Sequence, residues 1–457
     1  MLYYDGRDSF WGVDCIFVES QEGMKLYPID DEKIKYIFRH NVDVDFSITY
    51  KSDIYKNTVM NVHRISHGFH RGFELQANYV VKRIDEKPIS LMEITSEAID
   101  SLFSTVHYYY QQREKGIRSN HDLLYDIEEV NTWKIKYKDK EIAITLFYGE
   151  VLNAGIGSDI KIHPKLKIVF PETTDSSEIY DIYLIIKSFL QITRYGYNIG
   201  KTKVDLYNGQ GERRQLYGHL TDYSQSQNQE CSYSEVKYTL VKENIQNLLQ
   251  FSANNNNMQI GFIPNTFREI LNDSYDGLLF ATLYASFESE CHEKKEIYAQ
   301  ADDSALKNEK KELIDFIEDK SKRSDQNLKN FYSDIKGRII QYGTQIGQEK
   351  KIINAYSILS KALDDILQYV FFLPSFRINK YPSKEDIKII AKKINEFRGN
   401  VIHGGGKNTF SVEEAPFVQF LEILVYSMTL KRAGLEDGDI QRMIRVAVLH
   451  DFSIMYA

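Results

Sequence analysis

The stretch EFRGNVIHGGG, residues 396–406, places an arginine, a histidine and three glycines where a lysine-rich helical pattern ends. Arginine keeps its charge and presents a planar fork to phosphate oxygens, and histidine accepts or donates a proton near neutral pH. Metal-free cleavage of RNA needs both abilities, because a 2′-hydroxyl must lose a proton while an anionic phosphorane is stabilised. Arg398 and His403 are therefore candidate catalytic residues.

A structural interpretation of the same stretch stays open, in which His403 only caps the carbonyl groups of a helix end. Residues five apart on an intact helix point about 140° away from each other. Arg398 and His403 could share a phosphate if Gly399 and Gly404–Gly406 loosen the helix, or if a second subunit supplies the same motif. Asn400 could then hydrogen-bond the phosphate or orient the histidine.

The spacing from arginine to histidine is by itself weak support for a catalytic site, because the chain repeats this spacing elsewhere. The other instances are Arg64 with His70, Arg213 or Arg214 with His219, and Arg445 with His450. The first two lie in a strand-rich region and a glycine-punctuated loop, and the third lies on an amphipathic helix. Residues 396–406 differ from these because lysines precede the motif, at Lys384, Lys388, Lys392 and Lys393.

Composition limits the partners and cofactors. The net charge is −8, so nucleic acid would have to be held by a local basic strip rather than by the whole surface. The three cysteines, Cys15, Cys231 and Cys291, lie far apart and form no CxxC pair, which argues against a zinc site or a disulfide scaffold. We therefore expect no metal and no cofactor.

The location expected from the sequence is the cytoplasm. The stretch MLYYDGRDSFWG lacks the basic and apolar regions of a secretory signal, and apolar runs such as YVFFLP are too short to span a bilayer.

Periodicity predicts an α+β domain with an antiparallel sheet over residues 1–245. Strand patterns occur at 42–50, 78–84 and 165–170, a hairpin is expected at 132–149 with its turn at KDKE, and a helix is expected after Asp175.

We expect a linker at 246–270 and an all-α bundle over 271–457. Helical spacing recurs at 278–298, 353–372, 383–403, 411–434 and 439–452, with a long charged helix or helix pair between 305 and 342. Ser383 with Asp386 and Ser411 with Glu414 have the spacing of capping boxes.

RGNVIHGG resembles the signature of the HEPN superfamily, an arginine followed four to six residues later by a histidine near the end of a bundle helix. More narrowly, the chain is similar to ApeA-like members of bacterial antiphage systems. FATLYASFESECHE (280–293) resembles the helix that opens their HEPN domain, with Glu288 in the acidic position. Segments 93–103 and 165–199 follow the order of their β-rich N-terminal domain, so the resemblance spans most of the chain.

The resemblance implies a metal-independent endoribonuclease of abortive infection that cuts host or phage RNA, with tRNA as one candidate target. It assigns catalysis to Arg398 and His403 and supporting roles to Asn400 and Glu288. It also implies that two HEPN domains pair into a composite site, so we expect a homodimer or higher oligomer. A phage product would be the trigger, sensed by the N-terminal domain. Gly399 departs from the family, where the residue after the arginine is often polar.

Two other functions remain open. The helical domain could be a non-catalytic HEPN bundle that binds nucleotide or a partner protein, and would then cleave no RNA under any trigger. Alternatively, the β-rich domain could be the enzyme and the bundle a dimerisation domain, although the scattered arginines and histidines of the first half suggest little active-site geometry.

Overall fold

A computed structural model describes the chain as two compact units, Met1–Met258 and Gln259–Ala457. The structure describes all residues except 1–2, 11–12, 21–22, 30–41, 53, 68–72, 105–128, 152–160, 196–198, 210–214, 224–235, 256–275, 295–306, 323–325, 342–346, 374, 379–380, 403–408 and 456–457. Within the described part, no helix has both the length and the apolar character needed to cross a bilayer.

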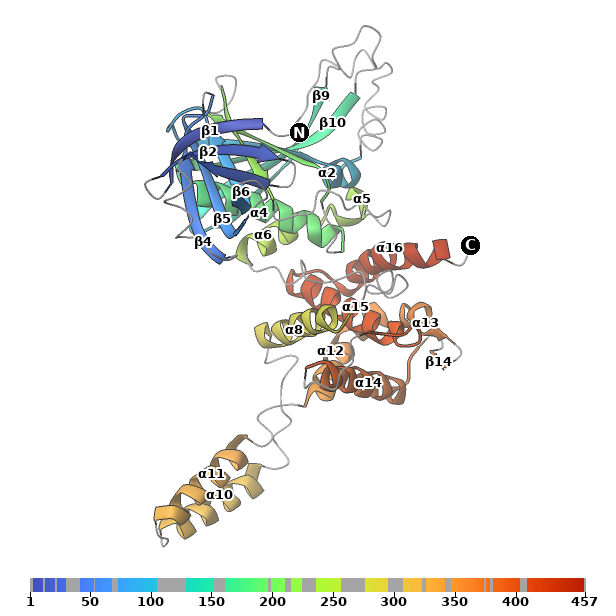
Figure 1. Ribbon diagram of the computed structural model, residues 1–457. Helices are drawn as coiled ribbons and strands as arrows, with labels where there is room; N and C mark the ends of the chain where they lie inside the picture. Colours follow the sequence, from blue (N-terminus) through green and yellow to red (C-terminus); the bar gives the residue numbers. More distant parts are fainter. Residues whose placement is uncertain are drawn as a thin grey trace. The chain divides into compact units, whose positions relative to one another are not determined.

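The N-terminal unit is built on an antiparallel sheet, as the strand patterns predict (Figure 1). Its strands are β1 (Tyr3–Phe10), β2 (Val13–Ser20), β3 (Gly23–Pro28), β4 (Val42–Tyr50), β5 (Asn57–His67), β6 (Phe73–Arg83), β7 (Ile89–Ser96), β8 (Glu129–Tyr137), β9 (Lys140–Val151), β10 (Lys161–Thr173), β11 (Thr202–Asn208) and β12 (Gln215–Asp222). The strand order is β1-β2-β3-β6-β12-β11-β7-β10-β9-β8, with β4 paired to β5 and β5 to β6.

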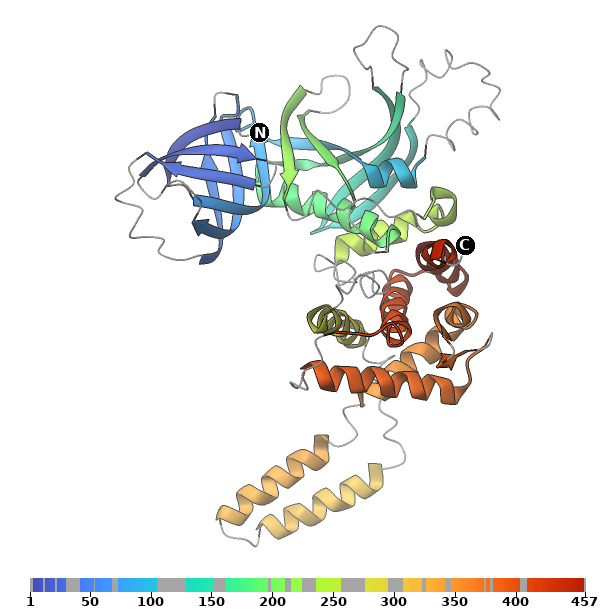
Figure 2. The ribbon, with the colours of Figure 1, turned by 45° about the vertical axis from the view of Figure 1, so that its right-hand side comes forward.

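Strand β6 is the branch point of the sheet. Along one edge its first residues pair with β3 and its last residues pair with β12, while β5 follows the other edge. Strands β2 to β6 contribute side chains to a shared apolar core. Figure 2 draws this curled part of the sheet in blue. In this core the rings of Phe17 and Tyr50 stack with centroids 4.2 Å apart.

Helix α4 (Ser176–Thr193) packs on the sheet through its apolar face. Tyr180 stacks on Tyr79 of β6 at 3.9 Å, and the Lys187 ammonium lies 2.7 Å from the buried Asp222 carboxylate of β12. Two shorter helices, α2 (Glu97–Leu102) and α5 (Tyr238–Val241), complete the connections of this unit.

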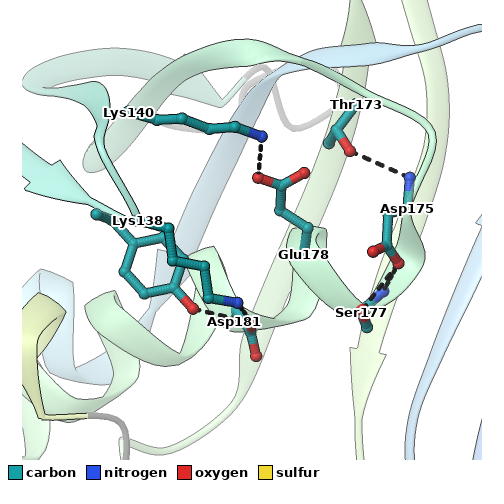
Figure 3. Close-up of polar contacts among 8 residues, drawn as sticks. Lys138, Lys140, Thr173, Asp175, Ser177, Glu178 and Asp181 are labelled. Carbon is teal, nitrogen blue, oxygen red and sulfur yellow. Dashed lines mark hydrogen bonds and ion pairs between the residues drawn. The ribbon is translucent and has the colours of Figure 1, made fainter.

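Polar contacts fix the start of α4 to the hairpin of β8 and β9, which confirms the hairpin expected at 132–149 (Figure 3). Its turn lies at Lys138 and Asp139, whose φ angles are 45° and 62°, the left-handed pair of a two-residue type I′ hairpin turn. Lys138 pairs with Asp181 of α4 at 2.8 Å, and Lys140 pairs with Glu178.

The domain boundary differs from the expected one. Helix α6 (Ile245–Asn254) occupies the beginning of the segment 246–270 that we expected to be a linker, and it belongs to the N-terminal unit. Its apolar positions at helical spacing are buried against α4 and β8. Gln250 also accepts from the backbone nitrogen of Lys136 and donates to its oxygen, at 2.9 and 3.0 Å, along the outer edge of β8. The remainder of that segment from residue 256 lies outside the described residues.

The C-terminal unit is helical. Its elements are α8 (Gly277–Glu293), α10 (Lys307–Lys322), α11 (Gln326–Gln341), α12 (Gln348–Leu363), α13 (Leu367–Val370), a small hairpin of β13 (Phe372–Leu373) and β14 (Phe376–Arg377), α14 (Lys384–Ile402), α15 (Ala415–Arg432) and α16 (Asp437–Met455). Helix α15 is buried along nearly its whole length and packs against α8, α12, α14 and α16. The charged segment expected as one helix or two is the helix pair α10–α11.

Candidate functional site

Arg398 lies in the last turns of α14, and aromatic packing fixes this end of the helix to α8. The preceding residue, Phe397, is buried, with its ring centroid 6.1 Å from that of Phe280 on α8 and 5.4 Å from that of Phe410. Because Phe397 anchors the helix, the neighbouring Arg398 is placed at the border of the core with its side chain 23% exposed.

The guanidinium of Arg398 contacts two side chains of α8. Its Cζ lies 5.4 Å from the ring centroid of Tyr284, which is a cation–π distance, and its Nη2 lies 3.7 Å from Oε1 of Glu288. Tyr284 and Glu288 are four residues apart and so share one face of α8. The Arg398 Nε is buried and has no hydrogen-bond acceptor in the described part of the chain.

A third helix completes the cluster through Gln348, the first residue of α12. Gln348 donates from Nε2 to Oε1 of Glu288 at 2.8 Å and accepts at Oε1 from the Tyr284 hydroxyl at 3.2 Å. Tyr284, Glu288, Gln348 and Arg398 therefore form a closed ring of contacts, which we call the Arg398 cluster. Glu288, to which the resemblance assigns a supporting role, lies beside the arginine.

The ion pair between Arg398 and Glu288 is weak enough for a ligand to replace the Glu288 carboxylate. Glu288 is 37% exposed and the 3.7 Å separation is long. A pair of this exposure contributes about 0.2–1 kcal/mol, whereas a phosphate can offer two oxygens to the guanidinium fork. The cluster thus holds Arg398 in place and leaves it able to bind a phosphate group.

Neither Tyr284 nor Cys291 is ionised at neutral pH. Burial raises the pKa of the Tyr284 hydroxyl, an effect that the Arg398 charge only partly opposes. The hydroxyl therefore remains a donor to Gln348. Burial likewise raises the pKa of the Cys291 thiol to about 12, so this cysteine is a poor nucleophile.

Gly399 does not loosen the helix as expected. Helix α14 continues through Gly399 and Asn400 to Ile402 without interruption. Asn400 is exposed, and on an intact helix it points about 200° from Arg398. The Asn400 side chain is therefore not brought to the cluster. His403 and Gly404–Gly406 lie outside the described residues, so the role predicted for His403 stays a prediction.

The lysine strip before the motif is partly neutralised. Lys388 lies 3.2 Å from Glu385 and Lys393 lies 3.5 Å from Glu396, both as exposed pairs three residues apart. Lys384 and Lys392 are also exposed.

In the other arginine–histidine pairs, the structure describes one histidine and one arginine in contact with an aspartate. The Nδ1 of His219 lies 2.8 Å from Asp205, and Arg445 pairs with Asp365 of the segment between α12 and α13. Arg213, Arg214 and His70 lie outside the described residues.

Sequence reasoning missed Tyr284 and Gln348. The sequence contains one local signal for Tyr284: it lies one helical turn before Glu288, which predicts that the two side chains share a face of the helix. It contains no such signal for Gln348, because the contact with Glu288 joins residues 60 positions apart.

Within the ranges that the structure describes, there is no group of three or more histidine, cysteine, aspartate or glutamate side chains that could hold a metal ion.

No protein-family model, curated protein or solved structure matches this chain.

Proposed function

We propose that the unit Gln259–Ala457 is a HEPN-like bundle that cleaves RNA without a metal ion, with Arg398 and His403 as its catalytic residues. The observation that carries this proposal is the state of Arg398. A helix end, a tyrosine ring and an exchangeable carboxylate hold its guanidinium at the border of the core, with Nε buried and unbonded among the described residues.

In the proposed reaction, the phosphate displaces Glu288 from the Arg398 fork. A histidine accepts the proton of the 2′-hydroxyl, whose oxygen attacks phosphorus and forms a new P–O bond. The bond to the 5′-oxygen then breaks, and this oxygen takes up a proton, which leaves a 2′,3′-cyclic phosphate and a free 5′-hydroxyl. Arg398 stabilises the charge that builds up on the phosphorane oxygens. His403 would serve as base, as acid, or as both if two subunits supply one motif each.

The proposed setting is the cytoplasm of a bacterium under phage attack, where cleavage of host or phage RNA, with tRNA as a candidate, stops phage production. The N-terminal unit would keep the nuclease inactive until it senses a phage product, because an unregulated ribonuclease would poison its own cell. The free, buried thiol of Cys291 is compatible with a reducing compartment.

The test is RNA cleavage by the purified chain, with and without phage lysate as trigger, using tRNA and a mixed RNA pool as probes. We expect Arg398→Ala and His403→Ala each to lower the cleavage rate by at least about 100-fold, since each removes a catalytic group. Arg398→Lys should also lose most activity, because lysine keeps the charge and lacks the fork.

The matched control is Arg445→Ala, which disrupts the other arginine–histidine pair of the helical unit and should leave the rate unchanged. Cleavage that survives both catalytic substitutions would show that the site is wrong. If the chain cuts no RNA with any trigger, the non-catalytic binding function replaces the nuclease.

A further inference from the structure

One carboxylate oxygen, Oε1 of Glu288, lies between side chains of two other helices. Gln348 of α12 donates to this oxygen from Nε2 at 2.8 Å, whereas Nη2 of Arg398, on α14, lies 3.7 Å from it. A hydrogen bond between a guanidinium and a carboxylate is normally about 2.7–2.9 Å long. Glu288 is therefore bonded to the neutral amide and is held short of a full ion pair with the arginine.

Tyr284 determines which end of the Gln348 amide faces the carboxylate. The Tyr284 hydroxyl donates to Oε1 of Gln348 at 3.2 Å, so the amide oxygen faces the tyrosine and the amide nitrogen faces Glu288. Burial raises the pKa of the Tyr284 hydroxyl, so it stays a donor at neutral pH. Because only the nitrogen of an amide can donate, this order of contacts directs the one donor group of Gln348 to the carboxylate.

The backbone that carries Gln348 is fixed relative to the helix that carries Arg398. The next residue of α12, Glu349, accepts at Oε1 from Nδ2 of Asn395 at 3.1 Å. Asn395 lies three residues before Arg398 on α14, within one helical turn. The first turn of α12 therefore contacts α8 through Gln348 and α14 through Glu349, which gives the half-buried amide a defined position beside Glu288.

Without this restraint, the Glu288 carboxylate could close on the arginine. An approach of about 1 Å would turn the present 3.7 Å separation into a charge-assisted hydrogen bond. The guanidinium can still take an acceptor, since Nε of Arg398 has none among the residues that the structure describes. A phosphate group would then compete with a tighter ion pair for the same planar fork.

We propose, on the basis of the nuclease function proposed above, that Gln348 is a positioning residue of the same site. By holding Glu288, it keeps the carboxylate from closing on Arg398 and leaves the guanidinium open to a phosphate group of the substrate. The loss of Gln348 then acts through Glu288 alone. Its effect should disappear when residue 288 carries no charge.

The first experiment measures how fast phenylglyoxal, a reagent for guanidinium groups, modifies Arg398 in the full chain. Peptide mass spectrometry gives the rate, and the exposed Arg377 is the internal reference. Gln348→Ala should slow the modification of Arg398 about two- to fivefold, because the released carboxylate covers the guanidinium. The double substitution Gln348→Ala with Glu288→Gln should restore at least the wild-type rate.

Gln441→Ala is the matched control, because Gln441 makes the same kind of contact elsewhere in the helical unit. Its Nε2 donates to Oδ1 of Asp365 at 2.7 Å, and the other oxygen of that carboxylate accepts from Arg445. The control thus removes one glutamine–carboxylate hydrogen bond beside an arginine other than Arg398. It should leave the modification rate of Arg398 unchanged.

A second experiment connects Gln348 to phosphate binding without any cleavage. A 2′-O-methyl oligoribonucleotide lacks the attacking hydroxyl, so fluorescence anisotropy measures its Kd for the full chain directly. Gln348→Ala should raise this Kd about two- to fivefold, and adding Glu288→Gln should return it to the wild-type value or below. A variant that had merely lost stability would not be rescued by a second substitution at Glu288.

A Gln348→Ala chain in which Arg398 reacts as fast as in the wild type would overturn the proposal. So would a slow reaction that Glu288→Gln does not reverse, because the effect would then not act through the carboxylate. Failure of the nuclease proposal has a different result. If the wild-type chain neither binds nor cleaves RNA while the phenylglyoxal rates follow the expected order, Gln348 does restrain Glu288, and RNA is the wrong ligand.

Discussion

Arg398 and Arg432 both pair with a glutamate of α8, and their surroundings give the two pairs different roles. Glu288, the partner of Arg398, is 37% exposed, whereas Glu290, the partner of Arg432, is 1% exposed. Arg432 donates from Nη2 and Nε to the two carboxylate oxygens of Glu290 at 2.7 and 3.0 Å, and Thr429 donates a further hydrogen bond at 3.0 Å. The first pair can be exchanged for a ligand, and the second is part of the core.

Replacing Arg432 should destabilise the helical unit strongly at neutral pH. Burial raises the pKa of the Glu290 carboxyl above its ordinary value, and Arg432 opposes that shift. Arg432→Met would leave a buried charge without compensation and should lower the free energy of unfolding by about 3–5 kcal/mol at pH 7. Chemical denaturation followed by circular dichroism measures this loss.

The same variant should lose less stability in acid. A carboxyl whose pKa is raised by folding binds a proton more readily in the folded state, so its contribution to stability is present at low pH and is lost as the pH rises through the folded pKa. Below the ordinary pKa of glutamate, Glu290 is neutral and no longer needs Arg432. Arg445→Met, which removes an exposed pair with Asp365, should cost at most about 1 kcal/mol at either pH. An equal loss from both variants would contradict this account.

At the scale of the elements, the beginning of α14 has the reciprocal cap that its sequence predicts. The Ser383 backbone nitrogen donates to Oδ2 of Asp386 at 2.8 Å, and the Asp386 nitrogen donates to the Ser383 hydroxyl at 3.1 Å. The second predicted box is partly formed: the Ser411 nitrogen and hydroxyl both contact Glu414.

Removing the cap should weaken α14 at the end opposite to Arg398. Ser383→Ala deletes the acceptor for the Asp386 nitrogen and should lower the free energy of unfolding by about 1 kcal/mol. Ser357→Ala, an exposed site inside α12, should be neutral or slightly stabilising, since alanine favours a helix interior. Thermal melts of both variants test the difference, and a melting temperature unchanged in Ser383→Ala would show that the cap adds nothing.

Patterns within short stretches of sequence predicted the helices and strands well, but they could not predict contacts between residues that are far apart in the chain. The 132–149 hairpin, the helix after Asp175 and the cap of α14 each depend on residues within a few positions of one another. The place of α6 depends on Gln250 meeting β8, more than one hundred residues earlier, and the Arg398 cluster depends on Gln348 meeting Glu288. Periodicity carries no information about such pairs. It also suggested a loosened helix at Gly399, where core packing by the adjacent Phe397 keeps α14 regular.

At the scale of the whole molecule, each of the two units contains its own apolar core. The N-terminal core gathers side chains of the sheet and α4, and the C-terminal core gathers those of α8, α12, α14 and α15. A unit with its own core is expected to fold independently.

The segments 1–258 and 259–457 should therefore each fold when produced separately. Circular dichroism should show mainly strand in the first and mainly helix in the second, each with a cooperative thermal transition. The two transitions should also appear in the melt of the full chain. A segment that is soluble only in the presence of the other would show that the cores are not independent.

The branch at β6 has a consequence for synthesis of the chain. Strands β6 and β7 follow each other in sequence, yet β12 and β11 lie between them in the sheet. The end of β6 must wait for β12, which ends at Asp222, 139 residues after Arg83, and the facing edge of β7 must wait for β11, which ends at Asn208, 112 residues after Ser96. At about 5–20 residues per second, these waits last about 6–28 seconds. During that time the nascent chain exposes unpaired strand edges that can join those of a neighbouring nascent chain, so chaperone binding early in translation should improve its yield.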